Sequence, residues 1–108
     1  MRKPIRFFLA ASLLAIGLPG WSQPSAKIEA GHRAFMAAGC YQCHGTVGQG
    51  GVGPRLAPAP LLVDAMIAFV RYTGRNMPPY SPQVLSDEDL RLIHGYLESI
   101  KDSNPPAP

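Results

Sequence analysis

The run Cys40-Tyr41-Gln42-Cys43-His44 constrains this chain more than any other part of its sequence. A Cys-x-x-Cys-His run is the attachment signal for c-type haem, because one helical turn can present both sulfurs to the two vinyl groups on one side of a porphyrin. The histidine follows at once, where its imidazole can bind the iron. We therefore predict one haem c, bound covalently through Cys40 and Cys43, with His44 as the first axial ligand.

Other interpretations of the two cysteines are a thioredoxin-like dithiol, a structural disulfide and half of a zinc site. A zinc site needs four ligands, and outside the motif the chain offers only His32, His94 and carboxylates, without the paired spacing of zinc modules. A dithiol protein would be favoured by an absence of bound haem after export. Haem attachment also accounts for the adjacent histidine.

The first residues have the pattern of a secretory signal peptide. Basic residues at the start precede an apolar stretch over residues 7–18, which is shorter than the roughly 20 residues that a membrane-spanning helix needs. We expect residues 1–23 to be a signal peptide, cleaved between residues 20 and 26, rather than a permanent anchor. Export to the periplasm agrees with the cysteines, because c-type haem is attached on the outer side of the bacterial inner membrane.

Loss of the signal peptide changes the charge of the chain. It removes Arg2, Lys3 and Arg6 from the ten basic residues and leaves seven against seven acidic ones. The exported chain therefore has no strongly basic surface, and nucleic-acid binding is not expected. About 85 residues remain, too few for a large polypeptide core. We expect one domain at residues 24–101 whose core a covalent porphyrin completes, no membrane span after processing, and a disordered Pro-rich tail at residues 102–108.

The spacing of apolar residues predicts three main helices and no strand, at about residues 26–38, 60–73 and 87–101. Pro60 suits the first position of the second helix, and Gly74 suits the residue just beyond its end. Asp64 and Arg71 mark the outer face of that helix. Ser86 is the predicted N-cap of the third helix, where acidic residues in the first turn favour the helix dipole.

A second axial ligand decides the chemistry, because a six-coordinate haem iron passes electrons whereas an open one binds small molecules. Met77 is the best candidate: two prolines follow it and stiffen its loop, and enough chain separates it from His44 to reach the opposite face of the ring. Met36 is tied too close to the haem motif, and Met66 is expected in the core. The two remaining histidines are expected to have ordinary structural roles: His32 and His94.

These residues together resemble the small class I c-type cytochromes, the soluble single-haem electron carriers. The matching positions span nearly the whole exported chain: Gly31, Phe35, the haem motif, Gly53-Pro54-Arg55-Leu56, Met77-Pro78-Pro79, Ile93 and Tyr96. The resemblance implies an all-α, class I cytochrome c-like fold with three main helices around the haem, in a cytochrome c domain at residues 24–101.

The resemblance also carries two expectations of contact. The first and last helices should cross, with Gly31 and Phe35 meeting Ile93 and Tyr96. The carbonyl of Pro54 should accept a hydrogen bond from the ring nitrogen of His44 that faces away from the iron, which orients the ligand and raises its basicity.

Two departures from the family pattern are a glycine-rich loop at residues 48–53 and the lack of a tryptophan in the exported domain, since Trp21 lies at the edge of the signal peptide. The family often places a tryptophan or another hydrogen-bonding partner beside a haem propionate. The sequence leaves several candidates open for that role: Arg55, Arg75, Tyr72 and Tyr80.

The leading hypothesis is a periplasmic electron-transfer protein whose iron cycles between the ferric and ferrous states without a catalytic acid or base. It would be a monomeric free carrier, or the small cytochrome subunit of a periplasmic dehydrogenase or oxidase, that exchanges electrons with redox partner proteins. The alternative is a haem enzyme or gas sensor with an open distal site, for which no distal acid–base group is evident. Docking is expected to use an apolar patch around the second helix: Leu61, Leu62, Val63, Met66, Ile67, Phe69 and Val70.

Overall fold

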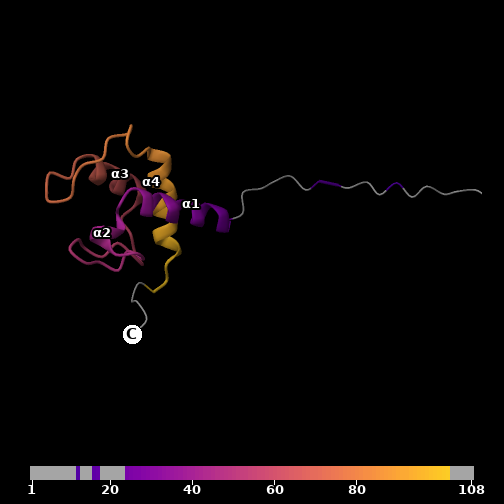
Figure 1. Cartoon of the computed structure of the whole chain (residues 1–108), viewed down its shortest axis with the longest axis horizontal. Helices are drawn as coiled ribbons and strands as arrows, with labels where there is room; N and C mark the ends of the chain where they lie inside the picture. The colour runs from indigo at the N-terminus through magenta and orange to yellow at the C-terminus, as the bar shows by residue number, and fades with distance from the viewer. Residues whose placement is uncertain (1–11, 13–15, 18–23, 103–108) are drawn as a thin grey trace, which may run out of the picture.

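The computed structural model describes residues 12, 16–17 and 24–102 of the 108-residue chain. No strand is present in this described part, so the predicted all-α class is confirmed. The predicted signal peptide and the tail beyond Asp102 lie almost entirely outside the described residues. None of the described helices has the length and apolar character needed to cross a membrane. Irregular loops join the helices shown in Figure 1: α1 (Pro24–Ala37), α2 (Tyr41–His44), α3 (Val63–Arg71) and α4 (Asp87–Ser99).

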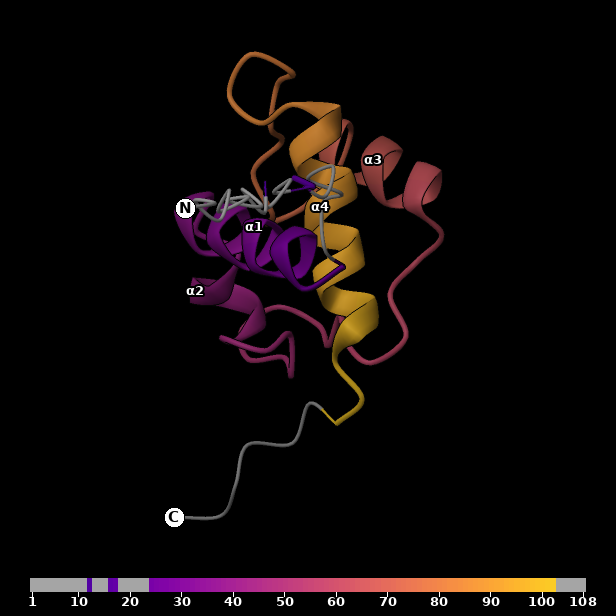
Figure 2. The same cartoon turned by 90° about the vertical axis from the view of Figure 1, so that its right-hand side faces the viewer.

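Helices α1 and α4 cross at close range, as Figure 2 shows. At Gly31 in α1, an added Cβ would lie 2.9 Å from Cβ of Tyr96 and closer still to the backbone of Leu92, so the approach requires glycine. One turn later Phe35 is fully buried, and its ring centroid lies 5.6 Å from that of Tyr96. Ile93 is buried in the same core. The helix crossing implied by the family resemblance is therefore confirmed.

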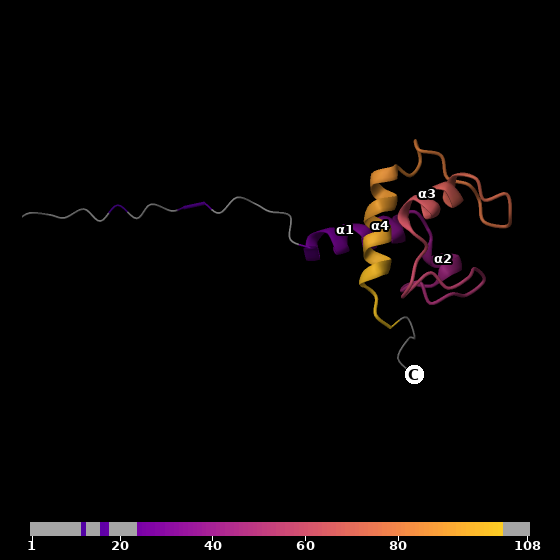
Figure 3. The ribbon, with the colours of Figure 1, turned by 180° about the vertical axis from the view of Figure 1, so that it is seen from behind.

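Helix α1 passes across α4. In Figure 3, the start of α1 lies on one side of α4, and its end lies on the other side, with α2, α3 and the long loops. The buried apolar side chains come mostly from α4 and from the elements that pack against it: Phe35, Ala57, Val70, Leu85, Leu90, Ile93, Tyr96 and Leu97. This core is small, as expected for a domain of this length.

The ends of α4 and α1 lie close to the predicted ones. Ser86 is the N-cap of α4, as predicted, and its Oγ accepts a hydrogen bond of 3.0 Å from the backbone N–H of Asp89. This bond satisfies one of the free N–H groups of the first turn. Helix α4 ends at Ser99, slightly before the predicted end, and α1 covers Pro24–Ala37.

Helix α3 is shorter than predicted, because it begins at Val63 and ends at Arg71. The expectation that Pro60 opens this helix is wrong. The carbonyl of Leu61 accepts a hydrogen bond of 2.8 Å from Nε2 of His94, which holds the preceding segment against α4. Gly74 adopts a φ of +57° after the helix, a left-handed conformation that suits glycine.

Candidate haem-binding site

A largely apolar cavity of about 340 Å³ lies between α3, α4 and the segment that follows the haem motif. Its volume falls in the usual range for small-molecule and cofactor sites. Cys40, His44 and Met77 all line it. So does most of the buried core: Phe35, Val70, Leu85, Leu90, Ile93 and Leu97. A group that filled this cavity would therefore complete the core.

His44 ends the short helix α2 and is 7% exposed. Its Nδ1 lies 2.7 Å from the carbonyl oxygen of Pro54. A carbonyl can only accept, so Nδ1 carries the proton and Nε2 keeps a free lone pair. This is the arrangement found at metal-binding histidines, whose second nitrogen donates to a backbone carbonyl or carboxylate. The hydrogen bond implied by the family resemblance is present.

The loop that follows His44, residues 45–57, is called here the His44 loop. It folds back onto the haem motif through its backbone, because Gly50 N–H donates to the His44 carbonyl and Gly53 N–H donates to the Cys43 carbonyl, each at 2.8 Å. A Cβ at Gly53 would lie 2.8 Å from Cε1 of the His44 ring. Glycine at this position therefore lets the loop pack directly against the imidazole.

The two cysteines differ in environment. Cys40 is half-buried and lines the cavity, whereas Cys43 is exposed. Burial raises the pKa of the Cys40 thiol, against a smaller lowering by a backbone hydrogen bond. Reactive redox thiols have lowered pKa values, so this environment does not favour the dithiol interpretation. No group of three or more metal-binding side chains of His, Cys, Asp or Glu gathers among the described residues.

Met77 lines the cavity from a long connection between α3 and α4, residues 72–86, called here the Met77 loop. The buried hydroxyl of Thr73 donates a hydrogen bond of 2.5 Å to the carbonyl of Met77. Met66 in α3 also lines the cavity, whereas Met36 does not. The fold thus brings Met77 and His44 to one cavity from two separate loops.

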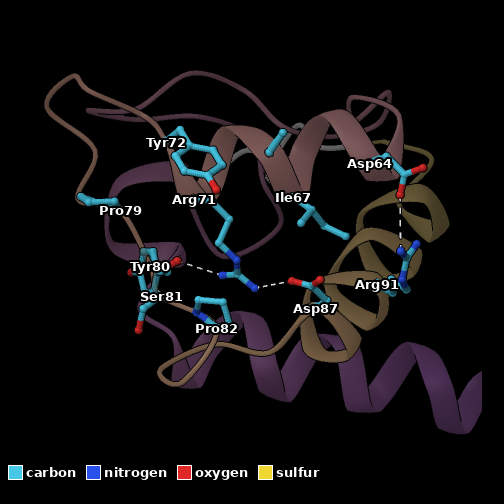
Figure 4. Close-up of a pocket in the computed structure, with 11 residues that line it drawn as sticks. Asp64, Ile67, Arg71, Tyr72, Pro79, Tyr80, Ser81, Pro82, Asp87 and Arg91 are labelled. Atoms are coloured by element: carbon cyan, nitrogen blue, oxygen red, sulfur yellow. Dashed lines mark hydrogen bonds and ion pairs between the residues drawn. The ribbon is translucent and has the colours of Figure 1, made fainter.

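Arg71 at the end of α3 holds the far end of the Met77 loop. The prediction that Asp64 and Arg71 mark the outer face of the helix holds for Asp64, whose side chain is exposed, but is wrong for Arg71, whose side chain is only 9% exposed. Figure 4 shows its guanidinium between two partners: Nη1 donates to the Tyr80 carbonyl at 2.9 Å, and Nη2 pairs with Oδ1 of Asp87 at 2.5 Å. These contacts lie in a groove of about 710 Å³. Among the residues that line this groove, only Tyr80 also lines the candidate haem cavity.

The other two histidines do not line the cavity. His94 donates from Nε2 to the Leu61 carbonyl, and its Nδ1 lies 3.4 Å from Oε2 of Glu98. His32 is exposed, with its ring centroid 4.9 Å from that of Tyr96. Both have structural surroundings that account for them.

The structure separates the four candidates for contact with a propionate. Arg55 and Tyr80 line the cavity, whereas Tyr72 and Arg75 do not and are exposed. The hydroxyl of Tyr80 already donates to the carbonyl of Ala38 at 2.7 Å. Of these two cavity-lining residues, Arg55 is the one with a cationic side chain, the type that pairs with carboxylates.

Comparison with known families agrees with this geometry. A family model described as cytochrome c oxidase, cbb3-type, subunit III, matches residues 26–97. The chain belongs to this family of c-type cytochromes. It is thus an electron-transfer haem protein of the cytochrome c class, and the predicted family is confirmed. Separate searches among curated proteins and among solved structures found no significant match.

The residues of the cytochrome fit the haem c that its family implies. An imidazole with a free Nε2, a thioether, two thiols next to the imidazole and apolar walls are the groups that such a cofactor needs. Sequence reasoning missed the contributions of Thr73, Arg71 and Tyr80. Each acts through a hydrogen bond from its side chain to a backbone carbonyl, which leaves no pattern in the sequence beyond an aromatic residue after Met77-Pro78-Pro79.

Proposed function

We propose that the cytochrome is a periplasmic electron-transfer protein that carries a single haem c. In this proposal Cys40 and Cys43 would hold the haem through two thioether bonds, and His44 and Met77 would bind its iron. The observation that carries it is that His44 and Met77 line one apolar cavity from separate loops, with Nδ1 of His44 bonded to the carbonyl of Pro54.

The haem, when bound, supplies a one-electron couple between ferric and ferrous iron. The Pro54 carbonyl keeps the proton on Nδ1 of His44, so the imidazole offers Nε2 in a fixed orientation. The thioether of Met77 is a soft ligand that favours the reduced metal and raises the potential. Most of the side chains that line the cavity are apolar. No acid or base is required, which supports a carrier rather than an enzyme.

Periplasmic location is supported by the signal-peptide pattern at residues 1–23 and by the confinement of both cysteines to the haem motif. The protein works either as a free carrier or as the cytochrome subunit of a dehydrogenase or oxidase. The family to which it belongs, that of subunit III of cbb3-type oxidases, supports a redox complex as its setting. Its partners are other redox proteins that donate and accept single electrons.

Absorption spectra of the purified, exported protein test this proposal. A low-spin c-type spectrum is expected in both the oxidised and the reduced protein. Met77→Ala should open the sixth position, make the iron high-spin or water-bound, and lower the potential. Met66→Ala is the matched control, because Met66 lines the same cavity, and it should keep the low-spin spectrum. A high-spin spectrum of the unaltered protein would contradict the proposal and favour an open distal site.

A further inference from the structure

The part of the Met77 loop next to the ligand has no backbone hydrogen bonds of its own. Within the described structure, residues 73–79 take part in no hydrogen bond between backbone groups, and the nearest one joins Tyr80 N–H to the Val70 carbonyl at 3.0 Å. Two prolines in this stretch lack an N–H donor altogether. Side chains must therefore hold this part of the loop in place.

Tyr80 joins this loop to the segment that enters the haem motif. Its hydroxyl donates a hydrogen bond of 2.7 Å to the carbonyl of Ala38, just after the end of α1 and shortly before Cys40. Carbonyls at the end of a helix lack intrahelical partners and need another donor. The bond spans two segments that lie far apart in the sequence, and both border the candidate haem cavity.

The backbone of Tyr80 is also fixed. Its carbonyl accepts from Arg71, whose guanidinium is paired on its other side with Asp87 at the start of α4 (Figure 4). One residue thus connects the Met77 loop to the ends of α1 and α3 and, through Arg71, to α4. Burial raises the pKa of the Tyr80 hydroxyl above its ordinary value, so the hydroxyl keeps the proton it donates at neutral pH.

We propose that Tyr80 is a positioning residue for Met77: its hydrogen bond to Ala38 holds the Met77 loop closed over the cavity, so that the thioether stays at the sixth position of the iron. The proposal rests on the proposed function in taking Met77 as an axial ligand. In this proposal the Tyr80 hydroxyl donates its hydrogen bond to the segment before the haem motif and not to a haem propionate.

Cyanide binding to the ferric protein tests this assignment, because an added ligand can reach the iron only when Met77 leaves it. Tyr80→Phe keeps the ring and removes one hydrogen bond. Such a bond shifts an equilibrium by about tenfold, so the apparent affinity for cyanide should rise by about that factor. Arg71→Gln, which frees the Tyr80 carbonyl, should raise the affinity in the same direction and serves as the second variant should Tyr80→Phe fail to fold.

Tyr96→Phe is the matched control. The hydroxyl of Tyr96 also donates to a backbone carbonyl, that of Thr46 at 2.9 Å, but in the His44 loop. The Tyr96→Phe substitution should therefore lower the stability of the fold without a change in cyanide affinity. An unchanged cyanide affinity in Tyr80→Phe would overturn the assignment. An equal rise in affinity in Tyr80→Phe and in Tyr96→Phe would also overturn it.

Amide hydrogen exchange gives a readout that does not depend on the iron. Exchange at the amide of residue 80, which donates to the Val70 carbonyl, should be faster in Tyr80→Phe, whereas Tyr96→Phe should affect Gly50 and Gly53 instead. A high-spin spectrum of the unaltered protein would count against the proposed function alone, because exchange would still show whether Tyr80 holds the loop. Unchanged exchange at the amide of residue 80 in Tyr80→Phe would overturn the positioning role.

Discussion

The two loops that border the candidate haem site are held by different kinds of contact. In the His44 loop the backbone bonds to itself, with the N–H groups of Leu56 and Ala57 both directed to the Gly48 carbonyl. In the Met77 loop the contacts near the ligand come from side chains, those of Thr73, Arg71 and Tyr80.

This difference teaches which substitutions each loop should tolerate. A loop closed by its own backbone depends on close approach, so an added Cβ is the damaging change. A loop held by side chains depends on a few polar groups, so the loss of one donor should loosen it while the fold survives. The His44 ring is therefore held by a loop with many backbone hydrogen bonds, whereas the contacts around Met77 can be removed one side chain at a time.

The largest effect should come from loss of the haem itself. Cys40→Ala with Cys43→Ala removes both attachment points, and most of the buried core lines the cavity that the haem would fill. We expect an unstable apoprotein with little helix content, because a chain of this length has a marginal core. Circular dichroism and thermal unfolding measure this. If the variant had the same helix content and melting temperature as the holoprotein, the two loops and the core would fold stably without the haem.

The second largest effect should come from a substitution in the His44 loop, which packs against the His44 ring. Gly53→Ala places a Cβ 2.8 Å from Cε1 of the His44 ring, which the bond to Pro54 holds in place. Crowding of this kind costs about 1–3 kcal/mol of unfolding free energy, and it should also perturb the haem spectrum. Chemical denaturation of the holoprotein measures the loss.

Gly95→Ala is the control for that substitution. Apart from its chain neighbours and the backbone of α4 itself, no heavy atom lies within 4 Å of an added Cβ at Gly95, so alanine should stabilise the helix by about 0.5–1 kcal/mol. Equal stability of the Gly53→Ala protein and the unaltered protein would mean that the His44 loop is as adaptable as the Met77 loop.

Much of the fold could be predicted from the sequence because it rests on local signals. The haem motif, the Ser86 cap and the small Gly31 at the helix crossing each depend on residue type at a fixed spacing. The placement of Met77 at the same cavity as His44 agrees with the prediction made from its loop, although ligation of the iron stays a prediction.

The parts that could not be predicted depend on contacts between distant segments. The sequence pattern puts the start of α3 too early, because Pro60 suits a first helical position, whereas the bond from His94 to the Leu61 carbonyl joins segments far apart in the sequence. Arg71 was placed on the outer face for the same reason, since its partners Tyr80 and Asp87 come from later in the chain.

A smaller effect should follow from the loss of one donor in the Met77 loop. Thr73→Val keeps the shape of the side chain and removes the hydroxyl that donates to the Met77 carbonyl. One such bond contributes about 1 kcal/mol, so the variant should be less stable by about that amount and bind cyanide more tightly. Thr46→Val is the control, because the Thr46 side chain is exposed, and it should stay within about 0.5 kcal/mol of the unaltered protein. A Thr73→Val protein as stable as this control would show that the loop does not depend on that hydroxyl.

The smallest effect should be that of salt on electron transfer. Part of the apolar patch predicted around the second helix is exposed, with Leu61 at 57%, Leu62 at 83% and Phe69 at 47% exposure, and Leu61 and Phe69 also line the cavity. Val70, however, is buried. The charges beside this surface are paired, since Arg91 lies 3.4 Å from Asp64.

A partner that docks on this apolar surface should be little affected by ionic strength. The exported chain balances seven basic against seven acidic residues, so long-range steering is weak, and the second-order rate with the redox partner should change by less than about threefold between low and physiological salt. Leu61→Ser, at an exposed site that lines the cavity, should slow the reaction, whereas Val84→Ser, at an exposed site that does not line it, should not. Redox partners touch over a small area and separate quickly, so the loss of one apolar side chain from the contact surface should be enough to slow electron transfer. A rate that falls steeply with salt would instead place the contact at a charged cluster, and the comparison of the two loops would then have to include charges such as that of Arg75 in the Met77 loop.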